Sequence, residues 1–140
     1  MPSQAQVAEG TSLKLAYAKA YLAEIEQRRH VFLAAQAGMS QRDIARSAHM
    51  SQATVHRVIR QAKVLGVEES VDEIVLSRFV GDIDAAEMMR RLVVFPRWVA
   101  RLVDPLDGVL PGDSEAELDA LVADGFLSDD EADAVVAAHG

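Results

Sequence analysis

Residues 41–60, QRDIARSAHMSQATVHRVIR, constrain the fold more than any other part of the chain. Ser40 and Ser51 can each act as a helix N-cap, because a serine hydroxyl accepts a hydrogen bond from a backbone N–H of the first helical turn. These two caps predict one helix over about 41–48 and a second over about 51–65. Only a tight turn of about three residues is left between the two helices.

The apolar residues of this stretch are spaced so that two steeply crossing helices can share a core. Ala45 is small enough to stand where the helices cross, and Met50 can fill the turn. His49 stands at a turn position that favours glycine, because the backbone there needs a positive φ, which costs free energy for other residues. The residues expected in the shared core are Ile44, Ala45, Ala48, Met50, Val55 and Val58.

With these features the stretch resembles the helix-turn-helix of phage repressors, of small bacterial regulators and of invertase-type recombinases. The resemblance covers 20 of the 140 residues, and residues 51–60 are its most family-like part. It implies a DNA-binding protein in which the helix over residues 51–63 enters the major groove of double-stranded DNA. His49 is the departure from the family pattern, since most members have glycine at this turn position.

The side chains that would meet DNA follow from the core positions, because Val55 and Val58 turn one face of the second helix inward. Glutamine can bond an adenine edge, arginine a guanine edge, and an alanine methyl can touch a thymine methyl. Candidates for base contact are Gln52, Ala53, His56 and Arg57. Candidates for contact with the DNA backbone are Gln41, Arg42, Ser51, Thr54 and Arg60. The resemblance to phage repressors also implies that Gln41 and Gln52 cooperate in reading one base.

The other interpretation of this stretch is an amphipathic helical hairpin with a solvated polar face. Such a face is expected to mix charges of both signs. No acidic residue occurs from Ser51 to Lys63, although the chain carries 22 acids among its 140 residues. The absence of acids therefore favours the DNA-binding interpretation.

The formal net charge of −8 is unusual for a protein that binds nucleic acid, but it is an average over two different halves. Residues 1–63 carry nine Lys or Arg and four acids, whereas residues 64–140 carry five Lys or Arg and eighteen acids. The basic half is the one suited to a polyanion, and the acidic half needs another role.

The remaining cap and stop residues predict an all-α fold of about seven helices, in which a helix-turn-helix domain precedes a small acidic helical region. A long supporting helix, capped by Thr11 and Ser12, is expected from about Leu13 to Ala37. Its apolar stripe, which packs on the same chain or forms a dimer seam, comprises Leu15, Ala18, Leu22, Ile25 and Phe32. Later helices are expected after Ser70, Asp84, Ser114 and Ser128, with a loop over residues 104–113. The expected domains are residues 1–66 and 67–140.

Several functional classes are not expected from the composition. The chain has no cysteine and only four scattered histidines, so neither a metal site nor a cofactor is predicted. No nucleophile and base occur at a recognised spacing, and the protein is therefore not expected to be an enzyme. Apolar stretches fall short of the ~20 residues that span a membrane, and no signal peptide is recognised, so a cytoplasmic protein is expected.

The acidic half contains one stretch, residues 88–103 (MMRRLVVFPRWVARLV), with a composition typical of interface cores. Met88, Phe95 and Trp98 are the candidates for a partner interface, and the alternative is that the aromatic residues form the core of the C-terminal helices. Residues 73–98, EIVLSRFVGDIDAAEMMRRLVVFPRW, weakly resemble the region that follows the DNA-binding part of small actinobacterial helix-turn-helix antitoxins.

Two functions are consistent with these features. The first is a sequence-specific transcriptional repressor that forms a homodimer and meets two half-sites about one DNA turn apart. The second is an antitoxin that represses its own operon and neutralises a toxin enzyme through the acidic half. An accessory domain of a recombinase or partition system is a third hypothesis, which the absence of recognisable catalytic residues disfavours.

Overall fold

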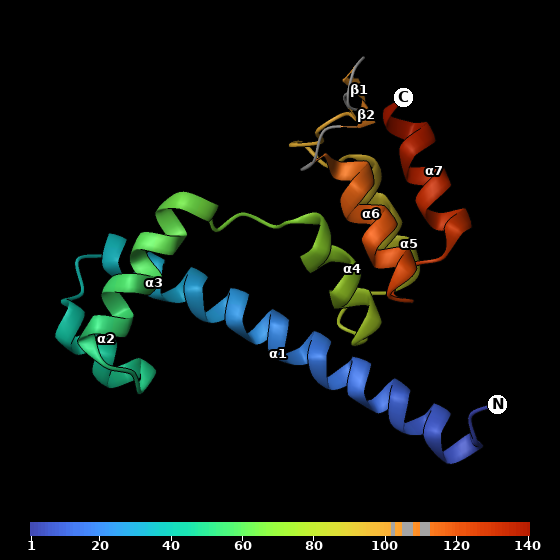
Figure 1. Ribbon diagram of the computed structural model, residues 1–140. Helices are drawn as coiled ribbons and strands as arrows, with labels where there is room; N and C mark the ends of the chain where they lie inside the picture. Colours follow the sequence, from blue (N-terminus) through green and yellow to red (C-terminus); the bar gives the residue numbers. More distant parts are fainter. Residues whose placement is uncertain (102, 105–107, 110–112) are drawn as a thin grey trace. The chain divides into compact units, whose positions relative to one another are not determined.

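The computed structural model of the chain describes residues 1–101, 103–104, 108–109 and 113–140. Within these residues the chain forms seven α-helices, shown in Figure 1: α1 (Gln4–Gln36), α2 (Gln41–Ala48), α3 (Gln52–Leu65), α4 (Val71–Phe79), α5 (Ala85–Val93), α6 (Ser114–Ala123) and α7 (Asp129–His139). The prediction of an all-α fold is confirmed. None of the helices in the described part is long and apolar enough to cross a membrane.

A minimal antiparallel ladder lies between α5 and α6. It pairs β1 (Val103–Asp104) with β2 (Gly108–Val109), two residues on each side. The predicted loop over 104–113 includes part of this ladder, and the remainder of that prediction lies outside the described residues.

The chain divides into two compact units, one over residues 19–68 and the other over residues 1–18 together with 69–140. We call them the basic unit and the acidic unit, because the first carries eight Lys or Arg and four acids and the second six Lys or Arg and eighteen acids. The boundary near residue 68 lies close to the expected one. Residues 1–18, however, group with the acidic unit and not with residues 19–68, which contain α2 and α3.

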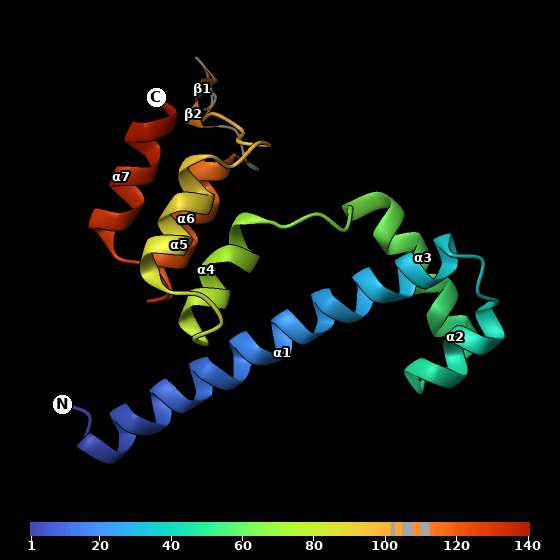
Figure 2. The same cartoon turned by 180° about the vertical axis from the view of Figure 1, so that it is seen from behind.

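The core of the basic unit lies where α2 and α3 pack on the C-terminal part of α1, as Figure 2 shows. Ile44, Ala45 and Val55 are buried there, as predicted, together with Val31 of α1. The partly buried residues packed against this core are Ala34, Ala35, Met50, Val58 and Ile59. The apolar offsets within residues 41–60 therefore identified the core of the two short helices, whereas Val31 lay outside the predicted stripe of α1.

The first helix begins earlier than predicted, at Gln4 and not near Leu13. Ser3 and Gln6 cap it reciprocally: the Gln6 N–H donates to the Ser3 hydroxyl (3.1 Å) and the Ser3 N–H donates to the Gln6 side chain (2.9 Å). Thr11 lies inside the helix, where its hydroxyl donates to the Val7 carbonyl (3.2 Å). The prediction that Thr11 caps the helix was wrong because its hydroxyl can also be satisfied by a carbonyl of the preceding turn.

The acidic unit has its own core, formed by residues of α4, α5, α6 and α7. Its largest fully buried side chains are Val71, Ile74, Val75, Leu76, Met88, Leu92, Leu118 and Val135. Ser70, Asp84 and Ser128 cap α4, α5 and α7, as predicted. The cap of α6 was wrongly predicted by one residue.

Asp113, and not Ser114, is the N-cap of α6, since its carboxylate accepts from the Ala116 N–H at 2.6 Å. Ser114 is the first helical residue, and its hydroxyl accepts instead from the Val99 N–H at 2.8 Å. Both residues are buried, so their polar groups need partners inside the unit. A tertiary contact to Val99, which sequence spacing does not show, thus decided which of two adjacent capping residues is used.

Candidate nucleic-acid interface

The turn between α2 and α3 contains the left-handed residue that the sequence predicted at position 49. Ser40 caps α2, because its hydroxyl accepts from the Asp43 N–H at 3.1 Å. His49 ends the helix with φ 56° and ψ 46°, the left-handed conformation expected at this position. The Met50 N–H then donates to the Ala45 carbonyl at 3.0 Å. Histidine is enriched among the non-glycine residues that adopt positive φ, so the turn forms at a modest cost.

Ser51 starts the second helix of the pair and positions its first turn. Its hydroxyl accepts from the Thr54 N–H at 3.0 Å and lies 2.9 Å from the Thr54 hydroxyl. Such a cap leaves other N–H groups of the first turn pointing outward, where a helix N-terminus favours an anion. The hydroxyls of Ser51 and Thr54, which are predicted to contact DNA, therefore also order the first turn of α3.

The side chains predicted to read bases lie on an exposed face of α3. Ala53, His56, Arg57 and Arg60 are exposed, and each lies three residues from one member of this set and four residues from another, which places them on one side of the helix. Gln52 is exposed in the first turn, whereas Val55 of the same helix is completely buried. Gln41 and Arg42 are exposed in the first turn of α2.

The arginines of this face differ from those of the acidic unit in their electrostatic partners. Within the part of the chain that the structure describes, none of the exposed arginines of α2 and α3 pairs with a carboxylate: Arg42, Arg46, Arg57 and Arg60. In the acidic unit, four arginines each have a carboxylate partner at 3.3 Å or less: Arg78, Arg90, Arg91 and Arg101. The positive charge of α2 and α3 is thus left uncompensated, as a polyanion would require.

Arg57 also lines a polar groove between α1 and α3 that sequence reasoning missed. The groove is lined by Glu24, Gln27 and Arg28 of α1 and by Thr54, Arg57 and Gln61 of α3. Arg28 could have been found as one of two adjacent arginines in the helix that precedes the motif. Sequence alone does not show which side of α1 faces α3.

The three residues expected to form a partner interface, Met88, Phe95 and Trp98, do not share one exposed surface. Met88 has no exposed surface, so it belongs to the core of the acidic unit, and its assignment to an interface was wrong. Phe95 and Trp98 are partly buried. The Trp98 ring stacks on the His139 ring with centroids 4.0 Å apart, and His139 Nε2 lies 2.7 Å from the Leu92 carbonyl. His139 therefore joins the end of α7 to the end of α5, and Trp98 packs on the His139 ring.

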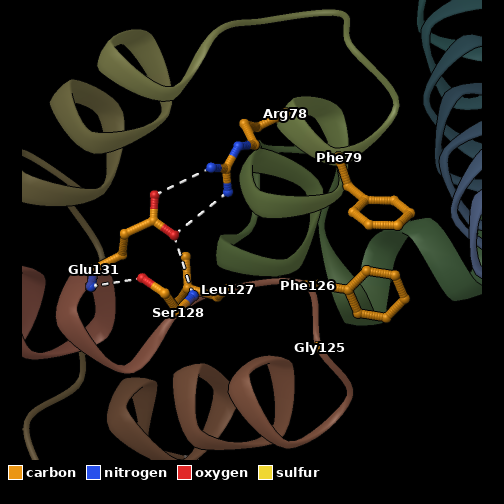
Figure 3. Close-up of a pocket in the computed structure, with 7 residues that line it drawn as sticks. All are labelled: Arg78, Phe79, Gly125, Phe126, Leu127, Ser128 and Glu131. Carbon is orange, nitrogen blue, oxygen red and sulfur yellow. Dashed lines mark hydrogen bonds and ion pairs between the residues drawn. The ribbon is translucent and has the colours of Figure 1, made fainter. Parts of the chain in front are cut away.

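Figure 3 shows a pocket of the acidic unit in which Arg78 and Glu131 form an ion pair beside two aromatic rings. The guanidinium and carboxylate are 3.3 Å apart, and the rings of Phe79 and Phe126 meet edge to face at 4.8 Å. Burial raises the pKa of Glu131, but hydrogen bonds from the Ser128 N–H and hydroxyl, together with Arg78, outweigh burial and lower the pKa overall. The carboxylate thus serves the capping box of α7, which explains its position without a reaction.

Among the described residues, no group of three or more His, Asp or Glu side chains is arranged to hold a metal ion. Comparisons of the chain with protein families, with curated proteins and with solved structures give no match. The functional assignment therefore depends on the geometry and charge of the site.

Proposed function

We propose that this protein is a sequence-specific DNA-binding transcriptional regulator that acts as a repressor and reads the major groove with α3. The observation that carries the proposal is the set of exposed, unpaired arginines on α2 and α3, in contrast to the four arginines of the acidic unit that pair with carboxylates. Phosphate neutralisation by arginine supplies most of the affinity of such proteins, and unpaired guanidinium groups are available to bind the phosphates.

The exposed residues divide into two roles in this proposal. Gln52, Ala53, His56 and Arg57 contact base edges and supply specificity. Ser51, Thr54 and Arg60 hold phosphates and fix the position of α3 in the groove. Gln41 and Arg42 contact the DNA backbone from the start of α2, and Gln41 supports Gln52 in reading a base. Val55 and Val58 hold the helix on the core and make no DNA contact.

A homodimer would present two copies of α3 to half-sites about one DNA turn apart. The acidic unit is suited to hold the two copies together, because it has a core of its own and an excess of acids that excludes it from DNA. Its exposed apolar residues at and beyond the end of α5, Val93, Val94 and Val99, are consistent with a protein contact.

The test is selection of bound sequences from a random pool of duplex DNA by the full chain, followed by titration of the selected duplex. We expect one enriched motif, and we expect Arg57→Ala to lose binding to it while the chain stays folded by circular dichroism. The matched control is Arg78→Ala, which removes the same charge from the acidic unit and should keep the motif. Recovery of no enriched sequence would contradict the proposal.

The second candidate function is an antitoxin, favoured by the separation of an acidic unit from the DNA-binding unit. Full chains that carry Arg57→Ala separate the two functions, since that change leaves the acidic unit intact. An antitoxin with this substitution would still suppress the toxicity of a co-transcribed gene product, whereas a repressor without a toxin partner would have no such effect.

A further inference from the structure

The groove between α1 and α3 in the basic unit contains an arginine with an unsatisfied hydrogen-bond donor. The Nε of Arg28 is buried from solvent and has no hydrogen-bond partner. Leaving such a donor unpaired costs about 1 to 3 kcal/mol, so a rotation of the side chain that lets the guanidinium meet an acceptor in the groove would recover that free energy. Arg28 stands beside Arg57 in the lining of the groove, and no described carboxylate pairs with either guanidinium.

The neighbours of Arg28 favour an anion with several acceptor oxygens. Gln27, Thr54 and Gln61 add amide and hydroxyl groups to the lining, all of which can donate hydrogen bonds. Glu24, one turn before Arg28, is the acid of the groove, and it forms no ion pair with Arg28. With two guanidinium groups and one carboxylate, the groove carries a net positive charge.

We propose that Arg28 and Arg57 together bind one phosphate of the DNA backbone, so that α1 takes part in DNA binding and does more than support the motif. The inference rests on the proposed function, because the phosphate belongs to the same duplex that α3 reads. Arginine bonds phosphate through two parallel N–H groups, and α3 carries Arg57 to the edge of the groove. Arg28 is then a positioning residue, which fixes the register of α3 and specifies no base.

The experiment compares full-length variants on the selected duplex and on duplexes with single base changes. Arg28→Met keeps an unbranched side chain as far as the position of Nε and removes the charge and the unsatisfied donor. We expect it to weaken binding about tenfold on every duplex, and to reduce the slope of log affinity against log salt by about one. Arg28→Lys should restore part of the affinity. Gln52→Ala, in contrast, should relax base preference and leave the salt slope unchanged.

Two further variants test the proposal, one that should leave binding nearly unchanged and one that should strengthen it. Lys19→Met removes one charge from the same helix, but Lys19 lies nine residues from Arg28, about 13 Å along the axis and on the opposite side of α1, and should have little effect. Glu24→Gln removes the carboxylate from the groove and should strengthen binding on every duplex.

Melting curves of each variant establish that the chain is folded. If Arg28→Met binds as Lys19→Met does, while Gln52→Ala still relaxes base preference, the phosphate site is wrong and the proposed function stands. If the unaltered chain selects no sequence, both proposals fail.

Discussion

At the scale of single residues, His49 is the position where the backbone departs most from what its side chain favours. Its φ of 56° is the one positive value among the described residues that are not glycine. The left-handed conformation costs an L-residue about 1 to 2 kcal/mol, although histidine tolerates it better than most residues. The turn between α2 and α3 therefore forms at a small cost in stability.

We predict that His49→Gly raises the free energy of unfolding by about 0.5 to 1 kcal/mol. Glycine adopts this conformation without strain, and the greater conformational entropy of glycine in the unfolded chain cancels only part of the stability gained. Gly38→Ala is the matched control, with φ 90° and no atom within 4 Å of an added Cβ, and it should be destabilising. Urea denaturation of both variants measures the effect. A loss of stability in His49→Gly would show that the imidazole makes contacts that offset its strain.

At the scale of helices, the acidic unit is held by carboxylates that pair within and between its elements. Glu87 accepts from Arg90 (2.6 and 2.8 Å) one turn later in α5, and from Arg91 at 2.8 Å. Arg91 in turn reaches Glu69, just before α4, at 2.7 Å. Hydrogen bonds from Arg90 and then Arg91 lower the pKa of Glu87 from 4.5 to about 2.

Because the pKa of Glu87 is lower in the folded protein, its ionised form stabilises the fold above pH 4.5, and this contribution disappears as the pH falls from 4.5 to about 2. We predict that Glu87→Gln lowers the free energy of unfolding at neutral pH and that the difference from the unaltered chain vanishes across this range. Glu9→Gln, at an exposed position of α1, is the control. If the difference in free energy of unfolding between Glu87→Gln and the unaltered chain stays constant with pH, the ionised form of Glu87 does not stabilise the fold.

At the scale of the whole molecule, the charges of the chain are separated between its two units, and this separation bears on the proposed binding to DNA. The basic unit carries an excess of four positive charges and the acidic unit an excess of twelve negative ones. If α3 binds DNA as proposed, long-range repulsion from the acidic unit should oppose any duplex that α3 does not bind specifically. Affinity should therefore come from a few close phosphate contacts, which makes it sensitive to salt.

We predict weak binding to random DNA and a steep loss of affinity for the selected duplex as salt increases, with a slope near −0.9 for each phosphate contacted. Fluorescence anisotropy over a salt series measures both quantities. Neutralising acids that lie outside the groove, such as Asp129 and Asp130 of α7, should strengthen binding to random duplexes. Micromolar binding of random DNA by the unaltered chain at physiological salt would contradict this prediction.

The sequence by itself determined the features that depend on neighbours along the chain. Ser40 and Ser51 fixed the starts of α2 and α3, and apolar spacing identified Ile44, Ala45 and Val55 as core. Such features are local, since a cap bonds an N–H two or three residues away and helical periodicity sets which side chains share a face. The exposure of every residue predicted to read bases follows from the same periodicity.

Only the tertiary structure decided which residues distant in sequence meet. It grouped residues 1–18 with the acidic unit, buried Met88, joined Trp98 to His139 and brought Arg28 beside Arg57. These outcomes depend on how helices pack, and packing involves many weak contacts between surfaces that no local pattern specifies. Arg28 and the adjacent Arg29 look alike in sequence, yet one lines the groove and the other donates to the Val67 carbonyl, because a step of one residue turns a side chain about 100° around the helix.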